Sequence, residues 1–232
     1  MQQKWIMGLA CCGIALLGGA AQAQEKAEVR VRLVTQSAQG ARAEPAIVWL
    51  EPLRGTIVPE FTPQRYTLLQ KNRTFQPHLL VIPVGSVVQF PNADPFFHNV
   101  FSLFDGKRFD LGLYEAGSTK TVTFSREGVS YIFCNIHPEM SAVVLTLSTP
   151  VFAVGDTKTA FALHEVPEGD YRLHEWVEGV TQADLNNLAR TVHVSSRVVD
   201  LGDVEVPAAH TRAAQHTDEY GHSYQPAAKS PY

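Results

Sequence analysis

Short runs of alternating or β-branched residues follow one another along most of the chain. The first, "EVRVRLVT", alternates between polar and apolar positions, and the later runs are bounded by glycine, proline or asparagine. A period of two and an enrichment in β-branched and aromatic residues are typical of β-strands. No long stretch shows a helical period. In the first part of the chain the runs cover 28–35, 46–52, 65–70, 78–92, 98–103, 120–125, 128–134 and 141–148.

A second set of strand-like runs follows a break near residue 149. These runs cover 159–179, 189–196 and 198–206. The turn "VPEGDY" joins two strands within them, and "TQADLNNLA" contains the one plausible helical turn. Short strands with closely spaced turns predict a sandwich or a barrel. We therefore expect an all-β protein, with a first domain at 24–148 and a small second β-sandwich at 149–206.

The two ends of the chain differ from this strand-rich middle. At the start, Lys4 precedes an apolar run at residues 5–17, and "AQA" at 21–23 is a small-x-small cleavage pattern. These features predict a signal peptide at 1–23 and export, to the periplasm in a cell with two membranes. The apolar run is shorter than the ~20 residues of a membrane-spanning helix, so we expect no membrane anchor. The polar, alanine- and proline-rich segment 207–232 predicts a disordered tail.

The charge of the chain is mild. The formal net charge of −4 becomes −5 when Lys4 leaves with the signal peptide, and no run of basic residues occurs. Nucleic acid is therefore not an expected partner. The sequence contains neither a Gly-rich phosphate loop after a strand nor a Gly-x-Ser-x-Gly elbow, so no catalytic motif is evident.

Cleavage after Ala23 would leave a single cysteine. Cys11 and Cys12 lie within the predicted signal peptide, so the mature chain keeps only Cys134. One cysteine in an oxidising compartment cannot form an internal disulfide. The thiol of Cys134 is therefore either a buried, inert side chain or a ligand of a metal.

Cys134 opens the motif "CNIHPEM", in which cysteine, histidine and methionine recur at three-residue intervals. The preceding strand should end there because Pro138 cannot donate to a ladder. Cys134, His137 and Met140 would then lie on one tight loop and could point at a common centre. A fourth ligand has to come from elsewhere in the sheet. The best candidate among nine histidines is His98 in "FPNADPFFHNVFS", at the opening of another strand.

This combination of side chains suits one metal in particular. Two imidazoles and a thiolate with a weak axial thioether are the ligands of a blue-copper electron-transfer centre. The soft thiolate suits Cu(I) and donates strongly to Cu(II), whereas zinc is better served by four strong donors. The residues thus predict one type 1 copper ion, bound by His98, Cys134, His137 and Met140.

The same residues resemble a known family, the cupredoxins. Cys-x2-His-x2-Met is similar to the ligand loop of amicyanin-like cupredoxins, and "FHNV" resembles the plastocyanin and amicyanin segment that carries the first histidine. The resemblance covers about 74–147 and implies a Greek-key β-sandwich. With a small sandwich after it, the chain resembles two-domain proteins described as plastocyanin-like or methylamine-utilisation proteins. The segment "VPEGDYRL" resembles a carboxypeptidase-regulatory or transthyretin-like sandwich.

The ligand set and the resemblance imply a periplasmic protein that carries single electrons between redox partner proteins. Because all ligand positions are filled by protein groups, we expect no independent catalysis. The alternative function is copper handling, by a chaperone or storage protein without an electron-carrier role, which the histidine-bearing tail mildly favours. A metal-free interaction module would be favoured if the ligands lay far apart.

Neighbours of the ligands have expected roles of their own. Asn99 could hydrogen-bond to the cysteine loop and tie the two ligand segments together, or be an ordinary turn asparagine. Phe96, Phe97 and Pro138 could form an apolar collar around His137 that serves as a docking surface, or simply pack between loops.

The remaining histidines and nearby acidic residues have plainer interpretations. His78 is the chief rival to His98, although a partly exposed histidine at a strand start is the simpler interpretation. Surface or structural positions are expected for His164, His174 and His193. The tail histidines His210, His216 and His222 could bind metal loosely or remain solvated. Solvated turns are the default for Asp94, Asp105, Asp110 and Glu115.

Overall fold

The computed structural model of the chain describes residues 26–35, 42–103, 106–195 and 197–209. The predicted signal peptide, the tail from residue 210 onward with its three histidines, and Asp105 lie outside these residues. The regular elements of the described part are strands and one short α-helix, so the all-β class is confirmed. Within it, no helix has the length and apolar character needed to cross a membrane.

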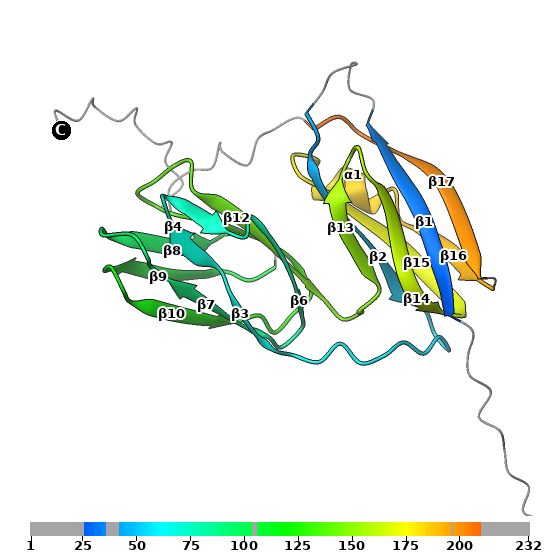
Figure 1. Ribbon diagram of the computed structural model, residues 1–232, viewed down its shortest axis with the longest axis horizontal. Helices are drawn as coiled ribbons and strands as arrows, with labels where there is room; N and C mark the ends of the chain where they lie inside the picture. The colour runs from blue at the N-terminus through cyan, green and yellow to red at the C-terminus, as the bar shows by residue number, and fades with distance from the viewer. Residues whose placement is uncertain (1–25, 36–41, 104–105, 196, 210–232) are drawn as a thin grey trace, which may run out of the picture.

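Figure 1 shows two lobes side by side, the first mostly cyan and green and the second blue, yellow and orange. The first lobe is a β-sandwich of residues 65–147 in which the sheet β6-β12-β11-β8-β9 faces the sheet β10-β7-β3, with the hairpin β4-β5 beside them. Its strands are β3 (Arg65–Thr67), β4 (Leu69–Lys71), β5 (Thr74–Gln76), β6 (Leu79–Pro83), β7 (Val87–Pro91), β8 (His98–Ser102), β9 (Phe109–Tyr114), β10 (Thr119–Thr123), β11 (Gly128–Phe133) and β12 (Ser141–Leu147).

The second lobe is a pair of sheets with the orders β14-β1-β17 and β13-β2-β15-β16. The inward positions of these strands form an apolar core, in which Val31, Leu50 and Leu173 are buried. Its elements are β1 (Lys26–Thr35), β2 (Pro45–Pro52), β13 (Phe152–Asp156), β14 (Ala160–Pro167), β15 (Gly169–Val177), α1 (Gln182–Asn186), β16 (Arg190–Val194) and β17 (Val198–Val206).

The pairing of β1 and β2 corrects the domain boundaries predicted from the sequence. β1 pairs with β14 and β17, and β2 pairs with β13 and β15, so both strands belong to the second lobe. The first lobe is inserted between β2 and β13, and residues 26–52 lie with 149–206 rather than within a domain at 24–148. Alternation along a strand predicts the strand but not its partner, because the partner lies far away in the sequence.

Strand β12 joins the cores of the two lobes. Ala142 and Val144 pack into the core of the first lobe, whereas Val143, Leu145 and Leu147 pack into the core of the second. Successive side chains of a strand point to opposite faces of the sheet, so β12 is buried on both faces. Its near-continuous apolar sequence, "SAVVLTL", suits this position.

Candidate metal centre

The four predicted ligands lie on two segments at one end of the first lobe. His98 is the first residue of β8, Cys134 directly follows β11, and His137 and Met140 lie in the loop that leads to β12. Strands β8 and β11 pair through Phe101 and Phe133. This pairing brings His98 beside Cys134, although the two residues are 36 positions apart in the sequence.

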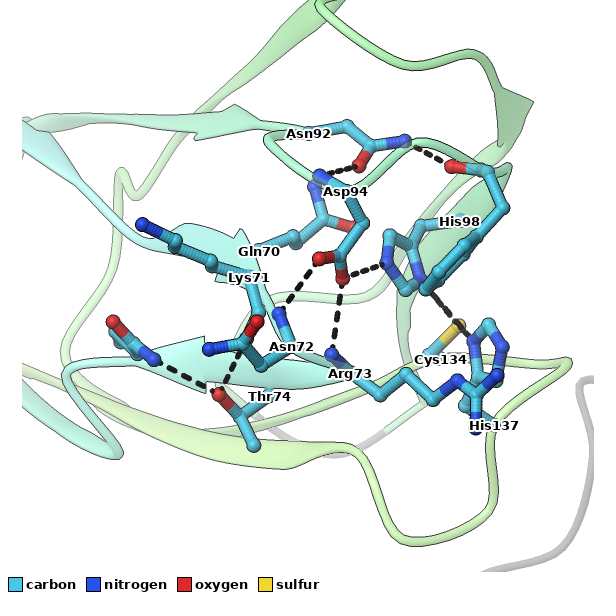
Figure 2. A network of polar contacts seen from close by, with 12 residues as sticks. Gln70, Lys71, Asn72, Arg73, Thr74, Asn92, Asp94, His98, Cys134 and His137 are labelled. Atoms are coloured by element: carbon cyan, nitrogen blue, oxygen red, sulfur yellow. Dashed lines mark hydrogen bonds and ion pairs between the residues drawn. The ribbon is translucent and has the colours of Figure 1, made fainter.

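Three donor atoms converge at this end of the sandwich (Figure 2). Nδ1 of His98 lies 3.1 Å from Nδ1 of His137, and Sγ of Cys134 lies 3.5 Å from Nδ1 of His137 and 3.8 Å from Nδ1 of His98. An ion with bonds of about 2.0 Å to nitrogen and about 2.3 Å to sulfur, as zinc makes, needs its donor atoms roughly 3 to 4 Å apart. The three side chains therefore fit around one metal ion.

Met140 is joined to two members of this group by backbone hydrogen bonds. Its N–H donates to the carbonyl of His137 at 2.9 Å, and its own carbonyl accepts from the N–H of Cys134 at 3.2 Å. These two bonds close the loop on itself. The side chains of Met140 and Cys134 are both fully buried and belong to the same apolar core. The loop thus keeps the side chain of the predicted thioether ligand in the same core as the thiol.

Backbone N–H groups surround the thiol of Cys134. Burial raises the pKa of this thiol, while hydrogen bonds from the N–H groups of Asn99, Ile136 and His137 act in the opposite direction. In addition, Oδ1 of Asn99 accepts from the N–H of Asn135 at 3.3 Å. The predicted role of Asn99 in tying the two ligand segments together is therefore confirmed.

An aromatic ring covers the two imidazoles. The Phe96 ring lies 5.2 Å from the ring of His98 and 5.7 Å from that of His137, measured between centroids. His137 is half-buried, and burial lowers its pKa, with the positive charge of Arg73 acting in the same direction. Phe96 therefore fills the predicted place in an apolar collar.

Two apolar residues near this edge face solvent. The side chain of Phe97 is 55% exposed and that of Ile136 is 45% exposed. Phe97 belongs to the predicted collar, whereas the sequence pattern does not single out Ile136. Pro138, the third predicted member, is partly buried.

Asp94 is the residue of this site that the sequence pattern misses. A solvated turn is expected there, but the side chain is only 5% exposed and its Oδ2 lies 2.8 Å from Nε2 of His98. Burial acts to raise the pKa of Asp94, but hydrogen bonds from the Arg73 N–H, from His98 and from the Asn72 N–H outweigh it and hold the pKa below its ordinary value. The one local signal is the spacing, because Asp94 stands four residues before the predicted ligand His98.

Within the described residues, His98, Cys134 and His137 form the one group of three or more histidines, cysteines or acidic residues able to hold a metal ion. His78 lies outside that group. Its Nε2 is 2.9 Å from Oε1 of Glu178 in the second lobe, and its Nδ1 is 3.2 Å from the carbonyl oxygen of Ser141.

The three other described histidines also have structural partners, as expected. A ring nitrogen of each lies within 3.4 Å of a carboxylate oxygen of the second lobe; the pairs are His164–Glu28, His174–Glu51 and His193–Asp170.

The sequence matches no protein-family model and none of the curated proteins compared with it. Among solved structures, the chain is similar to a purple cupredoxin from Nitrosopumilus maritimus, with 27% identity over 37% of this chain and 100% of that chain and a TM-score of 0.32. A copper-containing nitrite reductase from Thermus scotoductus matches with 23% identity over 50% of this chain and 28% of that one (TM-score 0.34). A reduced amicyanin variant matches with 19% identity over 35% of this chain and 80% of that one (TM-score 0.33).

The first lobe is a cupredoxin-like β-sandwich. Two facing sheets enclose one apolar core, and a histidine at the start of β8 meets a cysteine and a histidine beyond the end of β11. This arrangement agrees with the fold implied by the ligand motif.

Proposed function

We propose that the protein is a type 1 copper protein that carries single electrons. The observation that carries the proposal is the convergence of one thiol and two imidazoles within 4.8 Å, in a part of the fold that also buries Met140. A trigonal set of two histidines and one cysteine with a weak methionine is the ligand set of blue-copper centres. Copper bound there would supply the chemistry, by alternating between Cu(I) and Cu(II).

The protein's own contribution is a rigid and dry set of donors. His98, Cys134 and Met140 are fully buried, which excludes water from three of the four proposed ligands. The paired strands β8 and β11 fix the first two, and the hydrogen-bonded loop fixes the third. Donors held in one arrangement need little reorganisation when the charge of the metal changes. Because the chain itself supplies all four proposed donors, we propose a carrier rather than an enzyme.

The half-buried His137 is the ligand closest to solvent, and its surroundings suit contact with another protein. Exposed Phe97 and Ile136 offer apolar surface for a redox partner protein, which aromatic and apolar residues at interface centres commonly provide. We propose a periplasmic location, which the signal features of residues 1–23 support. A role in methylamine utilisation rests on the resemblance of the sequence alone.

Copper loading of the purified mature protein tests this function. The protein should turn blue with Cu(II) through the thiolate-to-copper transition, and Cys134→Ser should lose this absorption entirely because it removes the thiolate. His78→Gln is the matched control, since His78 lies outside the donor group and the colour should remain. A colourless copper-loaded wild-type protein would contradict the proposed function.

The same preparation separates electron transfer from copper handling. Reversible voltammetry with retention of the metal supports the carrier. Rapid loss of Cu(I) to a chelator, without a reversible redox response, supports a chaperone or storage protein instead.

A further inference from the structure

Asp94 lies on the side of the His98 ring that faces away from Cys134, and several groups form hydrogen bonds with it (Figure 2). Its Oδ2 lies 2.8 Å from Nε2 of His98 and accepts from the N–H of Arg73 at 3.0 Å, while its Oδ1 accepts from the N–H of Asn72 at 2.7 Å. The N–H of Asp94 itself donates to Oδ1 of Asn92 at 3.0 Å. The carboxylate is therefore fixed in position, and it is almost completely shielded from solvent.

The turn of the β4-β5 hairpin supplies two of these donors. Asn72 and Arg73 both adopt the left-handed conformation, with φ of 55° and 56°, which non-glycine residues rarely do. The hairpin is anchored to the loop that carries Asp94, because the N–H of Ala93 donates to the carbonyl of Gln70 at 2.9 Å. Two consecutive N–H groups thus point at one carboxylate, an arrangement that binds negative charge.

The contacts require a carboxylate at this position. Three donors, on Asn72, Arg73 and His98, share the two oxygens of Asp94. An asparagine offers one acceptor oxygen, and its NH2 group would face an N–H donor. The site is therefore built for a negatively charged side chain and not merely for a polar one.

The contact between Asp94 and His98 decides which ring nitrogen of His98 carries no proton. A carboxylate that accepts from Nε2–H leaves the lone pair on Nδ1, the atom that faces Sγ of Cys134 and Nδ1 of His137. Carboxylates that hold a ligating histidine in this way fix its orientation and raise its basicity.

We propose that Asp94 is a positioning residue of the metal centre, which keeps the proton of His98 on Nε2 and lowers the reduction potential of bound copper. Its negative charge, sheltered from water, favours Cu(II) over Cu(I) because the interaction grows with the charge of the ion and is weakly screened at a buried site. The effect on the potential rests on the proposed copper function, whereas the effect on the histidine proton does not.

The experiment compares Asp94→Asn with a matched control, Asp170→Asn. Asp170 also accepts from a histidine, His193, at 2.7 Å, but that pair lies on the exposed surface of the second lobe. Asp94→Asn should raise the reduction potential measured by voltammetry and weaken Cu(II) binding by roughly 10- to 100-fold, the range for loss of an outer contact to a metal ligand. Asp170→Asn should change neither quantity.

A second measurement uses the unmutated protein, so it does not depend on folding of the variant. Nitrogen-15 NMR of the histidine rings, in the metal-free and Cu(I)-loaded protein, should show a slowly exchanging proton on Nε2 of His98, whereas exposed His193 should exchange fast. A bare or fast-exchanging Nε2 of His98 would overturn the proposal.

The outcomes distinguish the two proposals. If the wild-type protein binds copper and Asp94→Asn lowers its melting temperature without moving the potential, then Asp94 is only a structural residue and the inference is wrong. If the wild-type protein binds no copper, the proposed function and the effect on the potential both fail, and NMR of the metal-free protein still decides the place of the proton.

Discussion

Glu175 is a buried carboxylic acid in the second lobe, far from the ligands in the sequence. It lies on β15 between the buried residues Leu173 and Val177, on the same face of the strand, and is 2% exposed. Neither of its oxygens has a hydrogen-bond partner within the described residues. Burial raises its pKa to about 7, although the charge of Arg190 acts to lower it. An unpaired charge is costly in such surroundings, so the neutral form is favoured.

This burial predicts a pH-dependent stability. The pKa of Glu175 rises from an ordinary value of 4.5 to about 7 on folding, so the folded state binds the proton more tightly. The free energy of unfolding should therefore fall as the pH rises from about 4.5 to about 7, by on the order of 3 kcal/mol. Glu175→Gln should remove this slope and be the more stable protein at pH 8, as measured by urea unfolding at several pH values.

Glu127→Gln is the control for this prediction, because Glu127 is exposed in a turn. Its urea midpoint should follow that of the wild-type protein at each pH. An unchanged slope in Glu175→Gln would show that other groups carry the pH dependence.

At the scale of single residues, the spacing of residues along one loop predicts candidate ligands. Contacts between residues far apart in the sequence cannot be predicted in this way. Cys134, His137 and Met140 are recognisable because their positions on one loop follow from the sequence itself. The role of Asp94 is not, because two of its donors lie on a hairpin 21 and 22 residues earlier. A carboxylate in a loop is usually solvated, and only the fold shows that this one is enclosed.

The strands, like the ligands, are predictable from the local sequence only in part. The run that forms β12 is recognisable as a strand from its β-branched residues. The local pattern does not predict β9, whose Asp110 is expected in a loop, because Asp110 and Gly112, which alternate with its apolar residues, are types depleted in strands. Strand type thus follows from the local sequence, whereas partner and register depend on tertiary packing.

Strand β12 supports a prediction about stability. Leu145 is 1% exposed and packs in the core of the second lobe, although its strand belongs to the first lobe. Leu145→Ala should lower the free energy of unfolding by about 2–5 kcal/mol, because it removes buried methyl groups and leaves a cavity. Denaturant unfolding of the metal-free protein measures this change.

Leu113→Ala provides the same substitution at an exposed strand position, since Leu113 on β9 is 57% exposed. This control should change stability by no more than about 0.5 kcal/mol. Equal losses in the two variants would show that β12 does not hold a shared core.

The whole molecule is one sandwich inserted into another. The chain leaves the second lobe after β2 and returns to it before β13, so the sheets of the second lobe combine strands from both sides of the insertion, β1 and β2 with β13 to β17 (Figure 1). Nε1 of Trp176 in the second lobe donates to the hydroxyl of Tyr131 in the first at 3.3 Å, and His78 contacts Glu178 across the same boundary. The boundary predicted near residue 149 coincides with the returning crossing. The sequence does not predict the point where the chain leaves the second lobe after β2, because the strands that pair with β1 and β2 follow the whole first lobe in the sequence.

A shared core predicts that the two lobes unfold together. Trp49 and Trp176 both lie in the second lobe, and the third tryptophan, Trp5, lies in the predicted signal peptide, so tryptophan fluorescence of a protein without residues 1–23 reports on the second lobe. The proposed copper–thiolate colour would report on the first. For the copper-loaded protein in urea, the two signals should give one midpoint, the expected behaviour of a single cooperative unit. Leu145→Ala should move both midpoints equally, because the apolar contacts it weakens join the lobes. Two separate midpoints would mean that the lobes fold as independent domains in spite of the inserted connection.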